Sequence, residues 1–484
     1  MEKKSSIKVN FIYNTIYQIL LIIIPLITSP YISRVLGSEG VGTYAYAFSI
    51  ANTAGMIGML GINNYGNRTI AALQDDREKR SQAFWSIWVL QIVMTTLVLA
   101  GYIVFSFEFC EKQYRIVMLI ETFEVATSLL DINWFFFGME KFKITVTRNI
   151  IIRLASVFCI FAFVRNVTDV WVYALIIAGG HFVGAIAIWP YLNKYVDFIM
   201  PTAKQVLSHL KQTIVLFIPI IAVTLYKRMD KVMLGSMSSM VQTGFYENTE
   251  KVINIPLSVI TAMGTVMLPR MSYLFRNEKE KQAMKYLSLS MEFVCLLSCA
   301  MSFGAAAIAN EFAPVFFGAE FTSIPPLIMA MCITIPFVAW ANVIRTQYLI
   351  PLHVDIVYVR SVWLGAIVNL IANAILIPHM SAMGAVIGTI LAELSAAVYQ
   401  TFSIRKRIPV VGFIKNGMYY LLCGIVMFIA IRFFAYKKQP SVLLIAEEIV
   451  IGVVVYCVLC LPYITYKHQD YINQFIRNRR GNSL

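Results

Sequence analysis

Fourteen apolar stretches, each about 20 residues long, follow one another along this chain and are separated only by short connectors. A helix of about 20 residues crosses the hydrocarbon core of a bilayer, and a helix satisfies its own backbone hydrogen bonds there. Only 14% of the 484 residues are charged and 59% are hydrophobic, whereas a soluble protein carries about 25% charged residues. The sequence therefore predicts an all-α integral membrane protein without a separate soluble domain.

The predicted spans share this length and composition. The first six cover residues 9–33, 42–67, 83–107, 114–138, 144–163 and 170–191. The next six cover residues 210–235, 243–268, 287–308, 321–350, 358–377 and 383–402, and the last two cover 413–434 and 442–464. The first stretch is too long for the apolar region of a cleaved signal peptide, so we expect it to be retained as a span.

Lys and Arg residues collect in alternate connectors. With the N-terminus placed in the cytoplasm, 27 of them lie in the inner connectors and the termini, 7 lie in the outer connectors and 6 lie inside spans. Cytoplasmic loops of membrane proteins are enriched in Lys and Arg. The asymmetry therefore predicts that both termini are cytoplasmic.

The basic composition does not indicate nucleic-acid binding. The net charge is +14, but the cations are scattered over short loops, as the positive-inside rule requires. The eight Cys residues show no zinc-ligand spacing with His. The sequence also lacks a P-loop, a GxSxG elbow and an HExxH motif. We therefore expect no enzymatic activity, no metal and no bound cofactor.

An internal repeat is visible at an offset of 202 residues. Gly42 matches Gly244, and Asn52 matches Asn254. Six spans separate the two copies, so both copies have the same orientation, as in a parallel repeat. The repeat predicts two pseudo-symmetric six-helix lobes that enclose a cavity, with two further spans outside the repeat. The predicted domains are 1–205, 206–408 and 409–484.

Asp230 and three cations, Lys227, Arg228 and Lys231, interrupt the seventh span. A charged side chain at the bilayer centre costs about 3 kcal/mol on insertion scales, so it faces a wet cavity, a partner charge or a substrate. Either the helix is short, or it carries these cations into the outer half of the membrane. A cationic lining that attracts a phosphate is one interpretation, and snorkelling to the outer headgroups is the other. We favour the first, because cations on the outer side are disfavoured unless something compensates them.

Further charges lie near the same depth. Glu247 and Lys251 are four residues apart at the start of the eighth span, so an ion-pair network between spans seven and eight is a second alternative to anion binding. Arg34, the repeat counterpart in the first lobe, and Arg153, in the middle of the fifth span, would add positive charge to a cavity. The candidate substrate-binding residues are Arg34, Arg153, Lys227, Arg228, Lys231 and Lys251.

Carboxylates form a second group. Glu124, Ser128 and Asp131 lie on one stripe of the fourth span. Carboxylates inside a membrane suit a proton or sodium coupling site, and the alternative is that they balance the charge of Arg153. The candidate ion-coupling residues are Glu121, Glu124, Asp131, Asp230 and Glu393.

Two segments resemble a known family. Residues 30–44 read PYISRVLGSEGVGTY, and the seventh span reads MDKVMLG shortly before GFY at residues 244–246. These segments resemble bacterial polysaccharide flippases of the Wzx type. That group belongs to the multidrug/oligosaccharidyl-lipid/polysaccharide exporter superfamily, which also includes the MATE drug pumps and the lipid II flippases.

The resemblance implies a V-shaped, MATE-like bundle of two six-helix lobes plus two accessory helices. It implies alternating-access movement of an undecaprenyl-pyrophosphate-linked oligosaccharide from the inner to the outer leaflet of a bacterial cell membrane, for capsule, O-antigen or a similar surface glycan. Carried over by position, Arg34 and the 227–231 cluster would line the cavity. Membrane lipids, a polysaccharide polymerase and glycosyltransferases are the implied partners, with no nucleic acid.

Other functions stay open at this point. A MATE-like, cation-coupled drug exporter would need an acidic, aromatic cavity, and the cations of the seventh span argue against it. A membrane-embedded glycosyltransferase would need a large outer loop with catalytic carboxylates, and the outer connectors are short. A non-transporting component of a glycan assembly complex would not need charges inside its spans.

Overall fold

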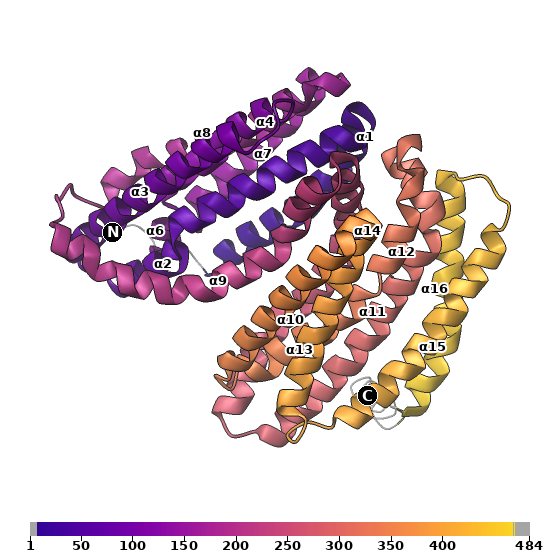
Figure 1. Cartoon of the computed structure of the whole chain (residues 1–484). Coiled ribbons are helices and arrows are strands. Elements are labelled where there is room, and N and C mark those ends of the chain that lie inside the picture. Colours follow the sequence, from indigo (N-terminus) through magenta and orange to yellow (C-terminus); the bar gives the residue numbers. More distant parts are fainter. Residues whose placement is uncertain (1–6, 468, 470–484) are drawn as a thin grey trace. The chain divides into compact units, whose positions relative to one another are not determined.

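The computed structural model describes residues 7–467 and residue 469 of the chain, and side chains from residue 20 onward apart from residue 22. Over this range the secondary structure is helical, without strands (Figure 1). Basic residues of both termini that entered the orientation argument, such as Lys3, Lys4 and Arg479, lie outside the described residues. The all-α membrane architecture is confirmed.

The helices have the following bounds. The first part of the chain forms α1 (Ile7–Met59), α2 (Ile62–Ala72), α3 (Arg77–Glu108), α4 (Arg115–Ile120), α5 (Thr122–Leu130), α6 (Asn133–Gly138), α7 (Phe142–Phe163), α8 (Val170–Ala187) and α9 (Ala203–Met237). The remainder forms α10 (Met240–Arg276), α11 (Glu280–Phe317), α12 (Pro325–Met331), α13 (Thr334–Ile344), α14 (Asp355–Ile404), α15 (Val410–Ala435) and α16 (Val442–Lys467), with a π-helical turn at Arg345–Leu349.

Eleven helical segments of the described chain are long and apolar enough to cross a membrane. Two of them, residues 23–72 and 355–404, contain 50 residues each, which is about 75 Å of helix and enough for two crossings. Interior breaks divide them at Gly37 and Ser381. Gly37 has φ 68°, a conformation that glycine adopts without steric cost. The fourth predicted span lies over the three short helices α4, α5 and α6, none of which is long enough to count among the eleven.

Two boundaries differ from the prediction. The connectors expected at residues 34–40 and 378–382 are helical on both sides of a single kinked residue. A local change of backbone direction at Gly37 or Ser381 therefore replaces the predicted loop. The sequence did not separate a kink from a short loop, because both appear as a small interruption of an apolar run.

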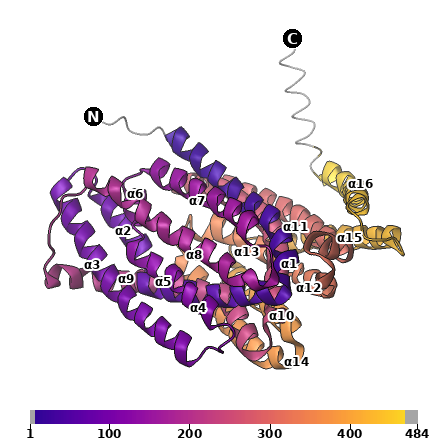
Figure 2. The same ribbon diagram turned by 90° about the horizontal axis from the view of Figure 1, so that it is seen from above.

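The chain divides into two compact units. The first contains the described residues through Asn248 together with Ala366–Gly388, and the second contains Thr249–Gly365 and the chain from Thr389. In the first unit α7 and α8 pack on each other and on α1, as both views show (Figures 1 and 2). The predicted lobe boundaries and the V-shaped arrangement stay predictions.

The second unit is held together by pairing of α11 with the two accessory helices. Arg432 of α15 forms an ion pair of 2.7 Å with Glu311 of α11, and the Tyr456 hydroxyl of α16 donates to the Leu296 carbonyl over 2.8 Å. Lys467 pairs with Glu292 over 2.9 Å. These contacts show that the two helices outside the repeat pack against α11.

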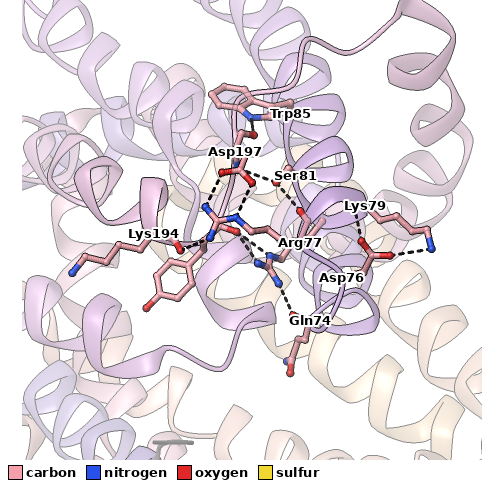
Figure 3. A network of polar contacts seen from close by, with 10 residues as sticks. Gln74, Asp76, Arg77, Lys79, Ser81, Trp85, Lys194 and Asp197 are labelled. Carbon is pink, nitrogen blue, oxygen red and sulfur yellow. Dashed lines mark hydrogen bonds and ion pairs between the residues drawn. The ribbon is translucent and has the colours of Figure 1, made fainter. Parts of the chain in front are cut away.

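A polar network fixes one end of the first unit (Figure 3). Arg77, the first residue of α3, donates two hydrogen bonds of 2.7 Å to the carboxylate of Asp197. Arg80, one turn later, donates to the backbone carbonyls of Gln74 and Tyr195. This end carries the cations Arg77, Lys79, Arg80 and Lys194 and is called the basic end below.

The Arg77–Asp197 pair gives a pH-dependent stability. The guanidinium hydrogen bond, with the charges of Arg77 and Arg80, holds the pKa of the Asp197 carboxyl below its ordinary value. The stabilisation is therefore present above about pH 4, where the unfolded carboxyl is ionised, and is lost as pH falls through the lower folded pKa. We expect Asp197→Asn to lower the melting temperature in detergent at pH 7 and at low salt. A deficit that persists unchanged at pH 3 would contradict this origin.

Candidate functional site

The cation cluster of the seventh span lies in the last third of a long helix. α9 contains 35 residues, about 50 Å of helix, so the alternative of a short seventh helix is excluded. Lys227 is exposed, and Arg228 is half-buried with its guanidinium 4.9 Å from the centre of the Phe48 ring. Asp230 and Lys231 are buried, with 3% and 6% of their surfaces exposed. The cluster thus has an accessible and an enclosed part.

Asp230 is the centre of a buried hydrogen-bond network. The Tyr246 hydroxyl of α10 donates to its carboxylate over 2.5 Å. The side-chain amides of Asn369 and Asn373, both on α14, donate to the other carboxylate oxygen over 2.9 and 2.5 Å. The Asn373 carbonyl oxygen is buried and has no hydrogen-bond partner within the described part of the chain. The consecutive helices α9 and α10 and the distant α14 therefore meet at one carboxylate.

Lys231 forms an ion pair with Glu247. The separation is 2.5 Å, and 8% of the Lys231 side chain and 16% of the Glu247 side chain are exposed. At this residue the structure favours the ion-pair network between spans seven and eight that the sequence left open. The role of Lys231 in substrate binding stays a prediction, and Arg228 and Lys227 are the more accessible cations of the cluster.

The helix of the fourth predicted span is interrupted at Asp131. α5 ends at Leu130, and Asp131 is extended with φ −73° and ψ 103°. Side chains of neighbouring helices bind the carbonyls that the break releases: Gln91 donates to Ser128 and Asp131, and Trp189 donates to Leu130. A break in lipid needs such substitutes for the helical hydrogen bonds. The backbone carbonyls at the break are therefore satisfied by side chains of the first unit.

A polar pocket adjoins this break. Its volume is about 210 Å³. The polar residues that line it are Thr127, Asp131, Asn133, Arg148, Asn149, Arg153 and His181. The Arg148 guanidinium is held by the side-chain oxygens of Asn133 and Asn149 and by the Gly184 carbonyl. Two of the sequence-predicted residues, Arg153 and Asp131, are thus brought to one pocket formed by α5, α6, α7 and α8.

The three carboxylates of the fourth span have three different environments. Glu124 bonds to His181 over 2.7 Å and accepts from Asn52 over 3.3 Å. Asp131 lines the polar pocket. Glu121 is completely buried, and neither of its oxygens has a hydrogen-bond partner among the residues that are described. The predicted stripe of residues 124, 128 and 131 ends at the helix break, so these groups do not form one shared site.

The remaining candidates are placed as follows. Arg34 is exposed on α1 in the first unit. Lys251 and Glu393 are half-buried and belong to the second unit. Their roles in binding and coupling stay predictions.

Sequence reasoning missed several polar residues of these sites. Asn369 and Asn373 are four residues apart in an apolar span, and amides at that spacing within a membrane helix would have been a usable signal. Arg148, Asn149 and His181 also line the polar pocket without having been predicted. None of them follows a motif.

Comparison with known proteins identifies the family. The family described as "Polysaccharide biosynthesis protein" matches residues 7–275, more than half of the chain. A "Putative O-antigen transporter" of Shigella dysenteriae is 22% identical over 392 residues, which is 79% of this chain and 96% of the relative.

Two solved structures show the same fold. The lipid II flippase MurJ in an inward closed conformation aligns with a TM-score of 0.72 at 14% identity, over 96% of this chain and 99% of MurJ. An inward-facing multidrug resistance MATE family transporter aligns with a TM-score of 0.59 at 10% identity, over 81% of this chain and 99% of that one. This similarity confirms the MATE-like helical architecture. With the family match over residues 7–275 and the resemblance at residues 30–44 and 229–246, the chain belongs to the polysaccharide biosynthesis protein family.

Proposed function

We propose that this protein flips an undecaprenyl-pyrophosphate-linked oligosaccharide from the inner to the outer leaflet of the bacterial cytoplasmic membrane. Both termini would be cytoplasmic, and the product would feed the assembly of capsule, O-antigen or exopolysaccharide together with a polymerase and glycosyltransferases. The observation that carries the proposal is the presence of cations inside helices of the first unit, Arg228 on α9 and Arg153 on α7. Family membership and the name of the Shigella relative support it.

The chemistry of the substrate explains the cations. A pyrophosphate headgroup that leaves water needs charge-assisted hydrogen bonds to replace its hydration. Arg donates in a planar fork that matches phosphate oxygens, and it stays charged in an apolar setting. Arg228 lies on an aromatic ring at the more accessible side of the α9 cluster. We expect Arg228 to contact the phosphate, with Lys227 and Arg34 adding to the positive potential and Lys251 as a further candidate.

A coupling cation, Na⁺ or H⁺, fits best at Asp230. The surrounding groups are a carboxylate, two carboxamides and a phenol, and oxygen donors of this kind suit hard cations. The Asn373 carbonyl oxygen is a buried acceptor without a hydrogen bond among the described residues, so it can serve a cation without breaking an existing contact. Neutralising Asp230 would change the electrostatic field on Arg228 and Lys231, which lie within one turn of α9. Asp230 would thereby link the driving ion to the binding cations.

Replacing Arg228 by Gln tests the role of the α9 cluster. In proteoliposomes loaded with a lipid-linked oligosaccharide, we expect the flipping rate of Arg228→Gln to fall by about 30-fold, because a hydrogen bond to a charged group contributes about 2 kcal/mol. Arg165→Gln is the matched control, since Arg165 lies in the connector after α7 and is exposed. A rate for Arg228→Gln equal to that of the control, at equal protein levels, would remove this cation from the mechanism.

A further inference from the structure

The polar pocket of the first unit contains the groups that recognise a phosphorylated sugar. Asn133, Asn149 and Asp131 offer amide and carboxylate groups that pair with sugar hydroxyls, and Arg148 and Arg153 are cations suited to phosphate. A single water needs only about 10–15 Å³, so a pocket of about 210 Å³ has room for a much larger polar group. The composition therefore indicates a ligand that carries both hydroxyls and negative charge.

The pocket lies at membrane depth. Arg148 and Arg153 follow the first residue of α7 by 6 and 11 positions, which places them about 9 and 16 Å along the helix. Polar side chains are costly there and mark substrate or ion pathways. The break between α5 and α6 contributes Asp131 and Asn133, and binding sites of membrane transporters are commonly built on such discontinuous helices.

An adjoining pocket leads from the basic end of the unit. Its volume is about 530 Å³, and it shares Arg148 and Ile152 with the polar pocket. It begins beside Lys143, the second residue of α7, and Tyr191, which follows α8. Its apolar lining consists of Ile144, Ile151, Ile152, Val183, Ala187 and Ile188. This pocket is thus basic at its entrance and apolar along its walls.

The geometry points to a binding site for the sugar-phosphate part of a lipid-linked saccharide, which enters from the basic end. The sugar next to the phosphate occupies the polar pocket, the phosphate lies against Arg153 and Arg148, and the first part of the lipid chain follows the apolar walls of the adjoining pocket. The two pockets hold three cations, Lys143, Arg148 and Arg153, and one carboxylate, Asp131. Their net charge is therefore positive by two, which suits a pyrophosphate. The inference rests on the proposed function. It places the site where the lipid-linked saccharide first binds among α5–α8, separately from the α9 cluster.

Binding to the purified full chain in nanodiscs tests the site with two probes. One is undecaprenyl pyrophosphate that carries a single N-acetylglucosamine, and the other is undecaprenyl pyrophosphate alone. We expect Arg153→Gln to weaken both probes by about tenfold, because it removes a charged donor to phosphate. We expect Asp131→Asn to weaken the sugar-bearing probe by about fivefold relative to the sugar-free probe, since asparagine still accepts the Asn133 backbone hydrogen bond but is a weaker acceptor for a sugar hydroxyl.

The controls separate this inference from the proposed function. Arg165→Gln should bind both probes as the wild type does, and Arg153→Lys should recover part of the affinity. If Arg153→Gln and Asp131→Asn both keep the wild-type melting temperature and bind both probes with wild-type affinity, the pocket assignment is overturned. Flipping by the wild-type protein would still leave the proposed function intact. Equal losses for the two probes in Asp131→Asn would overturn the sugar contact. A wild-type chain that neither binds nor flips the sugar-bearing lipid would overturn both.

Discussion

Replacing Gly42 or Gly244 by alanine is expected to leave little folded protein in the membrane. These two glycines are repeat counterparts, and the structure places them against each other where α1 crosses α10. A methyl group at Gly42 would overlap the Met240 carbonyl oxygen and lie 2.7 Å from the Gly244 nitrogen, and one at Gly244 would overlap the Ser38 carbonyl oxygen. Backbone atoms cannot move aside as a flexible side chain can. We therefore expect the free energy of unfolding to fall by about 3 kcal/mol or more.

Gly101 and Gly412 provide matched controls. A methyl group at either position meets no atom within 4 Å, so Gly101→Ala and Gly412→Ala should melt as the wild type does or slightly higher, as expected when alanine replaces glycine inside a helix. Thermal unfolding in detergent, with the yield of membrane-inserted protein, provides the measurement. If Gly42→Ala and Gly101→Ala behaved alike, the α1–α10 backbone contact would be refuted.

Asp230→Ala is expected to abolish flipping and to destabilise the first unit. The substitution would leave the Tyr246 hydroxyl and the amides of Asn369 and Asn373 without their shared acceptor. Each buried donor left unsatisfied costs about 1–3 kcal/mol. Asp230→Asn keeps the shape and removes the charge, so we expect it to fold but to lose the dependence of flipping on an imposed Na⁺ or H⁺ gradient. Melting curves and gradient-driven flipping in proteoliposomes distinguish the two effects.

Asp355→Asn is the control for this experiment, because Asp355 is an exposed carboxylate at the start of α14. It should flip and melt as the wild type does. Gradient-dependent flipping by Asp230→Asn at the wild-type rate would exclude Asp230 as the coupling group. Glu121, Glu124, Asp131 and Glu393 would then be the candidates to replace in turn.

The spans were predictable from the sequence because they are local patterns. A run of about 20 apolar residues has one stable arrangement in a bilayer, and the match of Gly42 with Gly244 needs no knowledge of the fold. The charges of α9 were found for the same reason, since any charge inside an apolar run is conspicuous. The ion pair of Lys231 with Glu247 is an example of the network between spans seven and eight that was the alternative to anion binding. It was predictable because the two residues lie on adjacent spans.

The contacts inside the sites were not predictable, because they join distant parts of the chain. Asp230 meets Asn373 across 143 positions, and Glu124 meets His181 across 57. The break after Leu130 carries no proline or glycine. It depends on Gln91 and Trp189 of other helices, which bind the freed carbonyls. Because the break depends on contacts with other helices, the sequence of the broken helix alone does not reveal it.

The most direct test of the central claim is the movement of a lipid-linked oligosaccharide across proteoliposomes that contain only this protein. An added glycosidase that cannot cross the bilayer reports the share of the lipid exposed on the outer face. We predict that, with the protein present, the enzyme removes the sugar from nearly all of the lipid, whereas protein-free liposomes keep their inner-leaflet share protected. Continued protection in the presence of correctly folded protein, together with gradient-driven export of a cationic dye, would contradict the account.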